Sequence, residues 1–247
     1  MAGLPLLAAT GMPAVAGSAL IERLIAEAAP RSRIADRIDF ISRRLLGVRY
    51  RANTLIGGPK HAEQFVVRDD AFDCVTFCEV VLAAAIARDF AAFEDALRRI
   101  RYDHGRVQYD QRNHYFADWC KRNIANGICK PVAIEPAVAY DKTVWWHREF
   151  GRRQVSISGI DKMTLLGSAK RLTAGDIIGF TSRRADLDYF HTGLVAFDRG
   201  GELMLRHASQ SRGRVIEEKM TAFVTVNPVK YVTLLRATDT APVAERS

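Results

Sequence analysis

Apolar residues recur at helical spacing through the first half of the chain. In the segment 32–46 they fall at i, i+4, i+7 and i+11, and Gly47 follows as a natural stop. The same periodicity predicts further helices over residues 18–29, 73–88, 90–100 and 114–126. Residues 47–69, which contain a Gly-Gly-Pro run, are expected to form a loop.

The second half of the chain has a different pattern. Short apolar runs alternate with Gly, Asp and Arg, and they predict strands over residues 177–180, 192–197, 202–206 and 231–236. Helices followed by strands favour an α+β chain. Residues 135–170 fit neither period and receive no assignment. We expect a single domain over 31–240, preceded by an N-terminal segment over 1–30.

Composition and charge narrow the class of protein. The chain has 247 residues, of which 48% are hydrophobic and 26% are charged, and these proportions exclude disordered, collagen-like and coiled-coil chains. The net charge of +8 favours an anionic partner. The basic residues are scattered, and the sequence contains no recognisable nucleic-acid-binding module, so we predict no nucleic-acid partner.

The N-terminus and the cysteines bear on the compartment and on metal binding. The first 21 residues contain no charge and resemble the apolar part of a secretory signal, although a basic leader is missing. We favour export to the periplasm or cell envelope, with a cytoplasmic location as the alternative. No later segment has the ~20 apolar residues of a membrane span. The spacing of the four cysteines fits neither a disulfide scaffold nor a zinc site, so we predict no metal.

One cysteine occupies a position suited to nucleophilic chemistry. Asp73 is a good N-cap, which places Cys74 at the first position of a helix. There the helix dipole and the free N–H groups can stabilise a thiolate, and the same N–H groups can hold an oxyanion. The alternative for any such residue is a core cysteine, which is our interpretation of Cys78 one turn later.

Two histidines provide a base and an orienting group for that base. His191 begins one predicted strand and His207 ends the next, so adjacent antiparallel strands would bring them together. One ring nitrogen of His191 would then bind His207 and leave the other facing the thiol. Taken singly, each histidine is more often structural, and we interpret His61, His104 and His147 in that way.

At this point several motifs, in this order, resemble a known family. They are LGVRY (46–50), FDCVTF (72–77), IRY (100–102), RNHYFADW (112–119), AGDIIGF (174–180), HTGLV (191–195) and HAS (207–209). This set resembles the NlpC superfamily of papain-like bacterial cell-wall cysteine peptidases. The closer resemblance is to its N-acetylmuramoyl-L-alanine amidase-like family, and it extends over about residues 34–236.

The resemblance implies a fold, a substrate and a set of roles. The fold would be papain-like, with N-terminal helices packed on a small antiparallel sheet or barrel, and the substrate would be peptidoglycan muropeptides, cleaved without a cofactor. Cys74 would be the nucleophile, His191 the base and His207 the orienting third residue. Tyr50 would add a hydroxyl near the oxyanion, beside Asp73.

Two further residues belong to the family's motif and have open roles. Arg112 and His114 would either line the substrate cleft or serve the structure, with Arg112 paired to a carboxylate and His114 capping the following helix. The oligomeric state is left open.

The sequence leaves four reactions or roles open. The family favours an amidase that cuts between the muramic lactyl group and L-Ala, whereas the wider superfamily favours a D,L-endopeptidase that cuts within the stem peptide after D-Glu. A cell-wall binding module without activity is a third alternative, which an intact Cys74, His191 and His207 disfavour. A lipid acyltransferase fits less well, because here the cysteine precedes the histidine and no apolar anchor follows.

Overall fold

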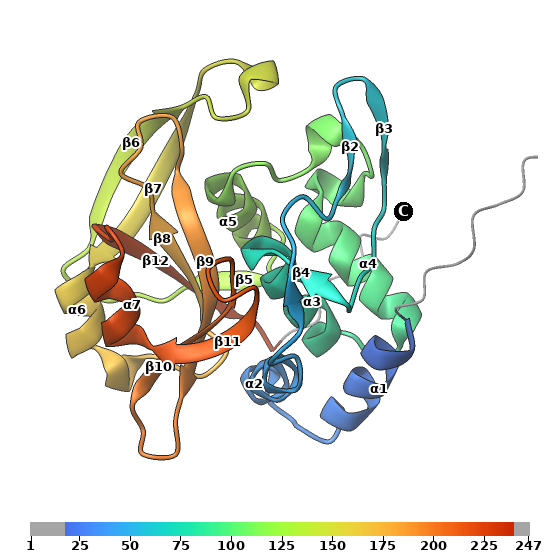
Figure 1. Ribbon diagram of the computed structural model, residues 1–247, viewed down its shortest axis with the longest axis horizontal. Helices are drawn as coiled ribbons and strands as arrows, with labels where there is room; N and C mark the ends of the chain where they lie inside the picture. Colours follow the sequence, from blue (N-terminus) through green and yellow to red (C-terminus); the bar gives the residue numbers. More distant parts are fainter. Residues whose placement is uncertain (1–17, 240–247) are drawn as a thin grey trace, which may run out of the picture.

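The computed structural model describes residues 18–239, and it has a helical half and a half built on a curled sheet (Figure 1). The helical half contains α1 (Ser18–Ala28), α2 (Ile34–Arg44), α3 (Cys74–Ile86), α4 (Phe90–Arg101), α5 (Phe116–Ala125) and the short turns η1 (Asp103–Gly105) and η2 (Tyr109–Gln111). These helices agree with the predicted ones to within about two residues at each end. The α+β prediction is confirmed.

The strands and the remaining short helices complete the fold. The predicted strands appear as β8 (Ile177–Thr181), β9 (Tyr189–Phe197), β10 (Leu203–Ser209) and β12 (Tyr231–Ala237). Strands without a prediction are β1 (Arg49–Tyr50), β2 (Ile56–Gly58), β3 (His61–Gln64), β4 (Ala71–Phe72), β5 (Cys129–Pro131), β6 (Val138–Val144), β7 (Arg153–Asp161) and β11 (Arg214–Lys219). The short helices of this half are η3 (Arg148–Phe150), α6 (Lys162–Gly167), η4 (Ala169–Arg171) and α7 (Met220–Val226).

Ten of these strands form one sheet that curls into a half-barrel. Its order is β4-β1-β11-β10-β9-β8-β12-β7-β6, with β5 added to β12, while β2 and β3 form a separate hairpin. The unassigned segment 135–170 is largely the long β6–β7 hairpin, whose β6 strand is mostly exposed and therefore lacks an apolar face. The narrower expectation of a papain-like fold stays a prediction.

Two apolar cores hold the halves together. One lies between the helices and the sheet and includes Phe77, Trp119 and Leu194. The other fills the inside of the curl and includes Phe180 and Phe223. Because β9 contributes to both cores, residues along this strand face the helices or the interior of the curl in turn.

Helix α3 is the centre of the helical half. It packs against α2, α4, β9 and β10, and it is buried along nearly its whole length. A buried ion pair fixes it, because Arg101 Nε of α4 donates to Glu79 Oε2 of α3 at 2.7 Å and Arg101 Nη1 donates to the Val66 carbonyl. None of the helices within residues 18–239 is long and apolar enough to cross a membrane.

The N-terminal predictions fall largely outside this description. The uncharged segment and its proposed role as a signal remnant lie mostly in residues 1–17, which are not among the described residues. Export therefore stays an expectation.

Candidate active site

The local structure around Cys74 is set by the cap of α3. Asp73 is the N-cap, with extended backbone angles, and its side chain accepts a hydrogen bond from the Thr76 backbone N–H at 2.8 Å. The Thr76 hydroxyl oxygen in turn accepts from the Asp73 backbone N–H at 2.9 Å, which completes a capping box. The predicted N-cap is confirmed, and Cys74 occupies the first helical position.

The Cys74 thiol is half-buried and has the helix N-terminus and β9 beside it. Backbone N–H groups of Thr192 and Val75 donate toward Sγ and favour the thiolate, but burial and the Asp73 carboxylate outweigh them and raise the pKa of the thiol to about 12. The helix end favours the thiolate, as the sequence predicts, but it does not outweigh the effect of burial. Cys74 is a neutral thiol at neutral pH.

His191 and His207 meet as the strand arrangement predicts. The distance between His191 Nε2 and His207 Nδ1 is 2.6 Å, and the two rings are nearly perpendicular, with an interplanar angle of 88°. Gly193 makes this approach possible, because a Cβ at that position would lie 2.9 Å from Cβ of His207. Burial, and after it the neighbouring His207, lower the pKa of His191 to about 3. The His191 ring is therefore neutral at neutral pH.

Glu218, which the sequence analysis did not identify, extends the contact between the two histidines. We call His191, His207 and Glu218 the row at the Cys74 site. Glu218 Oε1 lies 2.9 Å from His207 Nε2. Glu218 belongs to β11, whose charged sequence predicts no strand, and the pairing of β10 with β11 brings it beside His207. Burial lowers the pKa of His207, while Glu218 acts in the opposite direction. The signal that could have found it is the pair of consecutive glutamates one hairpin after His207.

Tyr50 lies on the other side of the thiol. β1 pairs in parallel with β4, and Tyr50 is aligned with Phe72, two residues before Cys74. Burial, Cys74 and Asp73 all raise the pKa of the Tyr50 phenol, so it remains protonated and can donate a hydrogen bond. The structure thus brings Tyr50, Asp73 and Cys74 together.

Thr192 links the thiol to the histidine strand. Its backbone N–H donates to Cys74 Sγ, and its hydroxyl donates to the Ile178 carbonyl at 2.8 Å and lies 3.9 Å from Cys78 Sγ. Cys78 is fully buried, which confirms its interpretation as a core residue. Within residues 18–239, no hydrogen bond joins Cys74 to His191, and His191 Nδ1 has no hydrogen-bond partner.

Arg112 is placed in a separate polar group. Its Nη1 donates to Glu63 Oε1 at 3.0 Å, the Tyr102 hydroxyl donates to the same oxygen at 2.9 Å, and its guanidinium lies over the Tyr109 ring. Arg112 is therefore paired with a carboxylate, as in the alternative that gives it a structural role. Among the described residues, no hydrogen bond or ion pair joins Arg112 to Cys74, His191 or His207.

His114 lies in an aromatic cluster next to Arg112. We use the name His114 cluster for Tyr109, His114, His147 and Phe150. Their rings contact one another edge-on, tilted or stacked, at centroid distances of 4.5 to 5.6 Å around Tyr109 and His114. The His114 ring donates from Nε2 to the Tyr109 carbonyl at 2.6 Å and α5 has no side-chain cap, so the capping alternative for His114 is wrong. The cluster joins the tip of the β6–β7 hairpin to η2 and shows no contact with the Cys74 site in the described chain.

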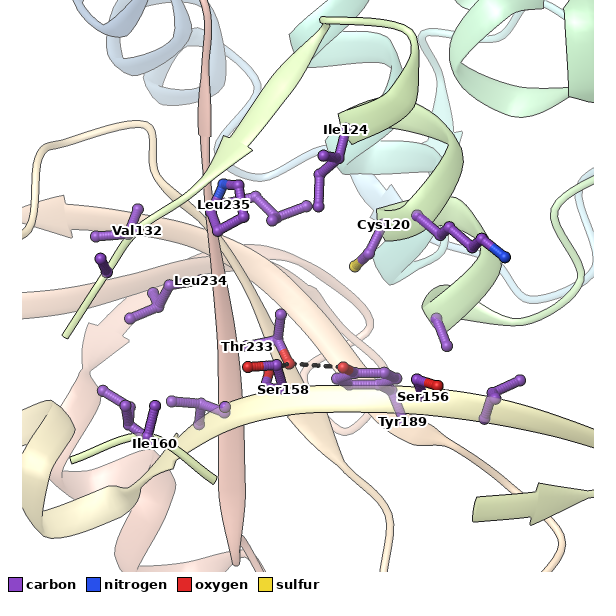
Figure 2. Close-up of a pocket in the computed structure, with 18 of the residues that line it drawn as sticks. Cys120, Ile124, Val132, Ser156, Ser158, Ile160, Tyr189, Thr233, Leu234 and Leu235 are labelled. Atoms are coloured by element: carbon purple, nitrogen blue, oxygen red, sulfur yellow. Dashed lines mark hydrogen bonds between the residues drawn. The ribbon is translucent and has the colours of Figure 1, made fainter. Parts of the chain in front are cut away.

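A separate cavity lies away from the Cys74 site. Figure 2 shows this cavity of about 610 Å³, bounded by α5, β5, β7 and β12, with Cys120, Ile124 and Leu235 on its walls. Tyr189 and Thr233 share a hydrogen bond of 2.6 Å at one side of it. None of the candidate catalytic residues lines it, so its size alone does not mark the site. No group of three or more His, Cys, Asp or Glu residues in the range 18–239 could hold a metal ion.

Comparisons with known proteins agree with the fold. The AmiA-like family model, described as N-acetylmuramoyl-L-alanine amidase-like, matches residues 40–232. A crystal structure of an N-acetylmuramoyl-L-alanine amidase from Bacteroides uniformis is similar over 83% of this chain and 99% of its own, with 24% identity and a TM-score of 0.74. A Legionella pneumophila protein of the DUF1460 family is similar over 88% and 93%, with 21% identity and a TM-score of 0.76. These likenesses show a shared fold. No relative among curated sequences matches the chain.

Proposed function

The chain belongs to the N-acetylmuramoyl-L-alanine amidase-like family, and from this premise we propose that it hydrolyses the amide between the muramic lactyl group and L-Ala of peptidoglycan, with Cys74 as nucleophile. The observation that supports this most strongly is the pairing of two elements. A thiol at a capped helix N-terminus lies beside a strand that presents a histidine with a bare ring nitrogen. Nucleophile, base and orienting group are the three parts that a thiol hydrolase requires.

In the first step, His191 Nδ1 accepts the Cys74 thiol proton as Sγ attacks the amide carbonyl carbon. The carbonyl electrons move onto oxygen and form a tetrahedral intermediate. When the C–N bond breaks, the imidazolium of His191 gives its proton to the leaving nitrogen of L-Ala. The lactyl group remains on Sγ as a thioester. Water, deprotonated by His191, then attacks the thioester and releases the lactyl carboxylate and the thiol.

Cys74 and His191 are both neutral before the reaction, which favours transfer of the thiol proton during the attack and not before it. Burial holds the Cys74 thiol and the His191 ring in their neutral forms. A resting thiolate–imidazolium pair would place two charges in a site that disfavours charge, so we expect the charge to develop only as the new C–S bond forms. Backbone N–H groups at the start of α3 and the protonated Tyr50 hydroxyl are available for the oxyanion.

The charge of the chain fits this substrate. Stem peptides carry free carboxylates, and scattered arginines suit such groups better than they suit a regular phosphate backbone. An extracytoplasmic substrate also agrees with the export we propose from the uncharged N-terminus.

The test is mass spectrometry of defined muropeptides after digestion. We expect wild type to release a peptide with a free L-Ala amine and an intact muramic acid, and Cys74→Ala to release neither. Cys120→Ala is the matched control, since Cys120 is a buried cysteine on α5 that takes no part in the proposed reaction; it should retain the wild-type products.

Other outcomes would redirect or reject the proposal. A cut after D-Glu would keep the cysteine mechanism and replace amidase by D,L-endopeptidase. Cleavage that persists in Cys74→Ala would reject Cys74 as the nucleophile. Muropeptide binding without cleavage by wild type would leave a cell-wall binding module.

A further inference from the structure

His207 lies between two hydrogen-bond partners of different kinds. Its Nδ1 is 2.6 Å from Nε2 of His191, and its Nε2 is 2.9 Å from a carboxylate oxygen of Glu218. The His207 side chain is only 3% exposed, whereas that of Glu218 is 31% exposed. The row therefore runs from a partly exposed carboxylate through the buried His207 to His191, which is itself partly exposed.

Counting protons along this row gives one consistent arrangement. A neutral imidazole has a single N–H, and a carboxylate accepts a hydrogen bond. When His207 donates from Nε2 to Glu218, its Nδ1 is bare and accepts from Nε2–H of His191. Nδ1 of His191 is then bare as well, and its lone pair is available to a thiol. In the reverse arrangement, His207 donates from Nδ1 to Nε2 of His191, and the proton of His191 is on its Nδ1. That nitrogen then has no lone pair with which to accept the thiol proton.

We propose that Glu218 is a positioning residue that sets the tautomer of His191 through His207. This inference rests on the proposed function, in which His191 Nδ1 is the base. Glu218 touches neither the thiol nor the substrate position, and it acts only through the ring between them. During the attack His191 gains a positive charge. The carboxylate of Glu218 stabilises this charge through the hydrogen bonds of His207.

The surroundings of His207 leave Glu218 as the acceptor that determines which nitrogen of His207 is protonated. Phe223 of α7 lies 5.4 Å from the His191 ring and 5.5 Å from the His207 ring, and Phe180 stacks on His191 at 6.2 Å, measured between centroids. These walls offer no alternative acceptor to His207. The neighbouring Glu217 is bound to Arg206, with Arg206 Nε donating to it at 2.8 Å. Successive residues of β11 point to opposite faces, which separates the two glutamates.

The first measurement is the tautomer itself, which ¹⁵N chemical shifts of labelled histidines report without any turnover. In wild type we expect Nε2–H on both His191 and His207. In Glu218→Ala we expect the row to lose its fixed direction, with Nδ1–H appearing on both rings. Glu218→Gln retains an acceptor oxygen and should retain most of the wild-type tautomers.

The second measurement is steady-state kinetics on the muropeptide that wild type cleaves. Loss of an orienting group behind a functional histidine reduces activity by about 10- to 100-fold. We expect Glu218→Ala to show this loss in kcat with little change in KM, and Glu218→Gln to recover most of it. Glu202→Ala is the matched control, because it removes a partly exposed carboxylate that pairs with Lys219, the residue after Glu218, and that bonds to neither histidine; it should keep the wild-type kcat and tautomers.

The outcomes separate this inference from the proposed function. Wild-type tautomers and kcat in Glu218→Ala would overturn the positioning role while leaving the amidase assignment intact. Equal losses in Glu218→Gln and Glu218→Ala, with unchanged tautomers, would also overturn it and indicate a structural role. An inactive wild type would reject the proposed function, and the tautomers could still be measured. If Glu218→Ala fails to fold, the tautomers and kcat of Glu218→Gln decide: Nδ1–H on His191 at full activity overturns the proposal.

Discussion

Two groups of side chains in this molecule contain nearly the same residue types but differ in what their atoms bind. The row at the Cys74 site has two histidines and a glutamate, and it ends at a bare nitrogen of His191. The His114 cluster also has two histidines, with Glu149 3.8 Å from His147, but the His114 ring is tied to a main-chain carbonyl and enclosed by other rings. Burial makes the histidines of both groups neutral. The difference that matters for chemistry is therefore the free lone pair and the thiol next to it.

The largest effect expected from this comparison is on turnover. His191→Gln removes the base, and general-base catalysis contributes about 10²- to 10⁴-fold, so kcat should fall by that factor. His114→Gln removes a ring of the hairpin contact and should lower kcat by less than about tenfold, with a lower Tm. Both variants are compared on the same muropeptide.

Equal losses of kcat in His191→Gln and His114→Gln would contradict the proposed difference between the row at the Cys74 site and the His114 cluster. A large rise in KM confined to His114→Gln would instead move His114 into the substrate cleft, which the family resemblance allows.

Some residues of these regions can be predicted from the sequence, and others cannot. Cys74 and Asp73 follow from local rules, a cap and a helix start. The meeting of His191 and His207 follows from adjacent strands, although both residues lie inside β9 and β10 and not at the predicted strand ends. Glu218 and the pairing of Arg112 with Glu63 depend on the register of β10 with β11 and on a hairpin reached across the fold. Local periodicity does not encode such distant contacts. The β6–β7 hairpin was not predicted for a related reason. Strand β6 is mostly exposed and has no alternating apolar face that would indicate a strand in the sequence.

The same limit applies to the charge state of the thiol. The helix N-terminus is visible in the sequence and favours a thiolate, whereas the burial that outweighs it depends on the packed structure. A rule about one helix end therefore predicts the position of Cys74, but it does not determine the ionisation of the thiol.

The next effect concerns the ion pair that holds the helix bearing Cys74. Glu79→Gln leaves Arg101 buried without its charge partner, and such a loss costs about 3–5 kcal/mol of the free energy of unfolding. Glu94→Gln is the matched control, because its partner Arg98 is partly exposed and surface pairs contribute about 0–1 kcal/mol. Urea denaturation of both variants gives the two values. A loss below about 1 kcal/mol in Glu79→Gln would show that α3 does not depend on this pair.

A smaller effect distinguishes a neutral pair from a resting ion pair. The pKa of His191 is about 3 and that of Cys74 is about 12, so His191 becomes protonated only in strong acid and Cys74 loses its proton only in strong base. The rate of Cys74 alkylation by iodoacetamide should thus be low and should rise with pH through neutrality, without a step near the ordinary histidine pKa of about 6.5. A plateau of fast alkylation from about pH 4 to 7 would indicate a resting thiolate and contradict the neutral pair.

The smallest effect separates the two contributions of Asp73. Its side chain caps α3 by accepting from Thr76, and its charge raises the pKa of Cys74. Asp73→Asn keeps a capping oxygen and removes the charge, so the free energy of unfolding should change by less than about 0.5 kcal/mol while alkylation of Cys74 becomes faster at a given pH. Asp73→Ala removes both and should lose about 1 kcal/mol in addition. If Asp73→Asn leaves the alkylation rate unchanged, burial alone sets the ionisation of the thiol, and the carboxylate acts only as a cap.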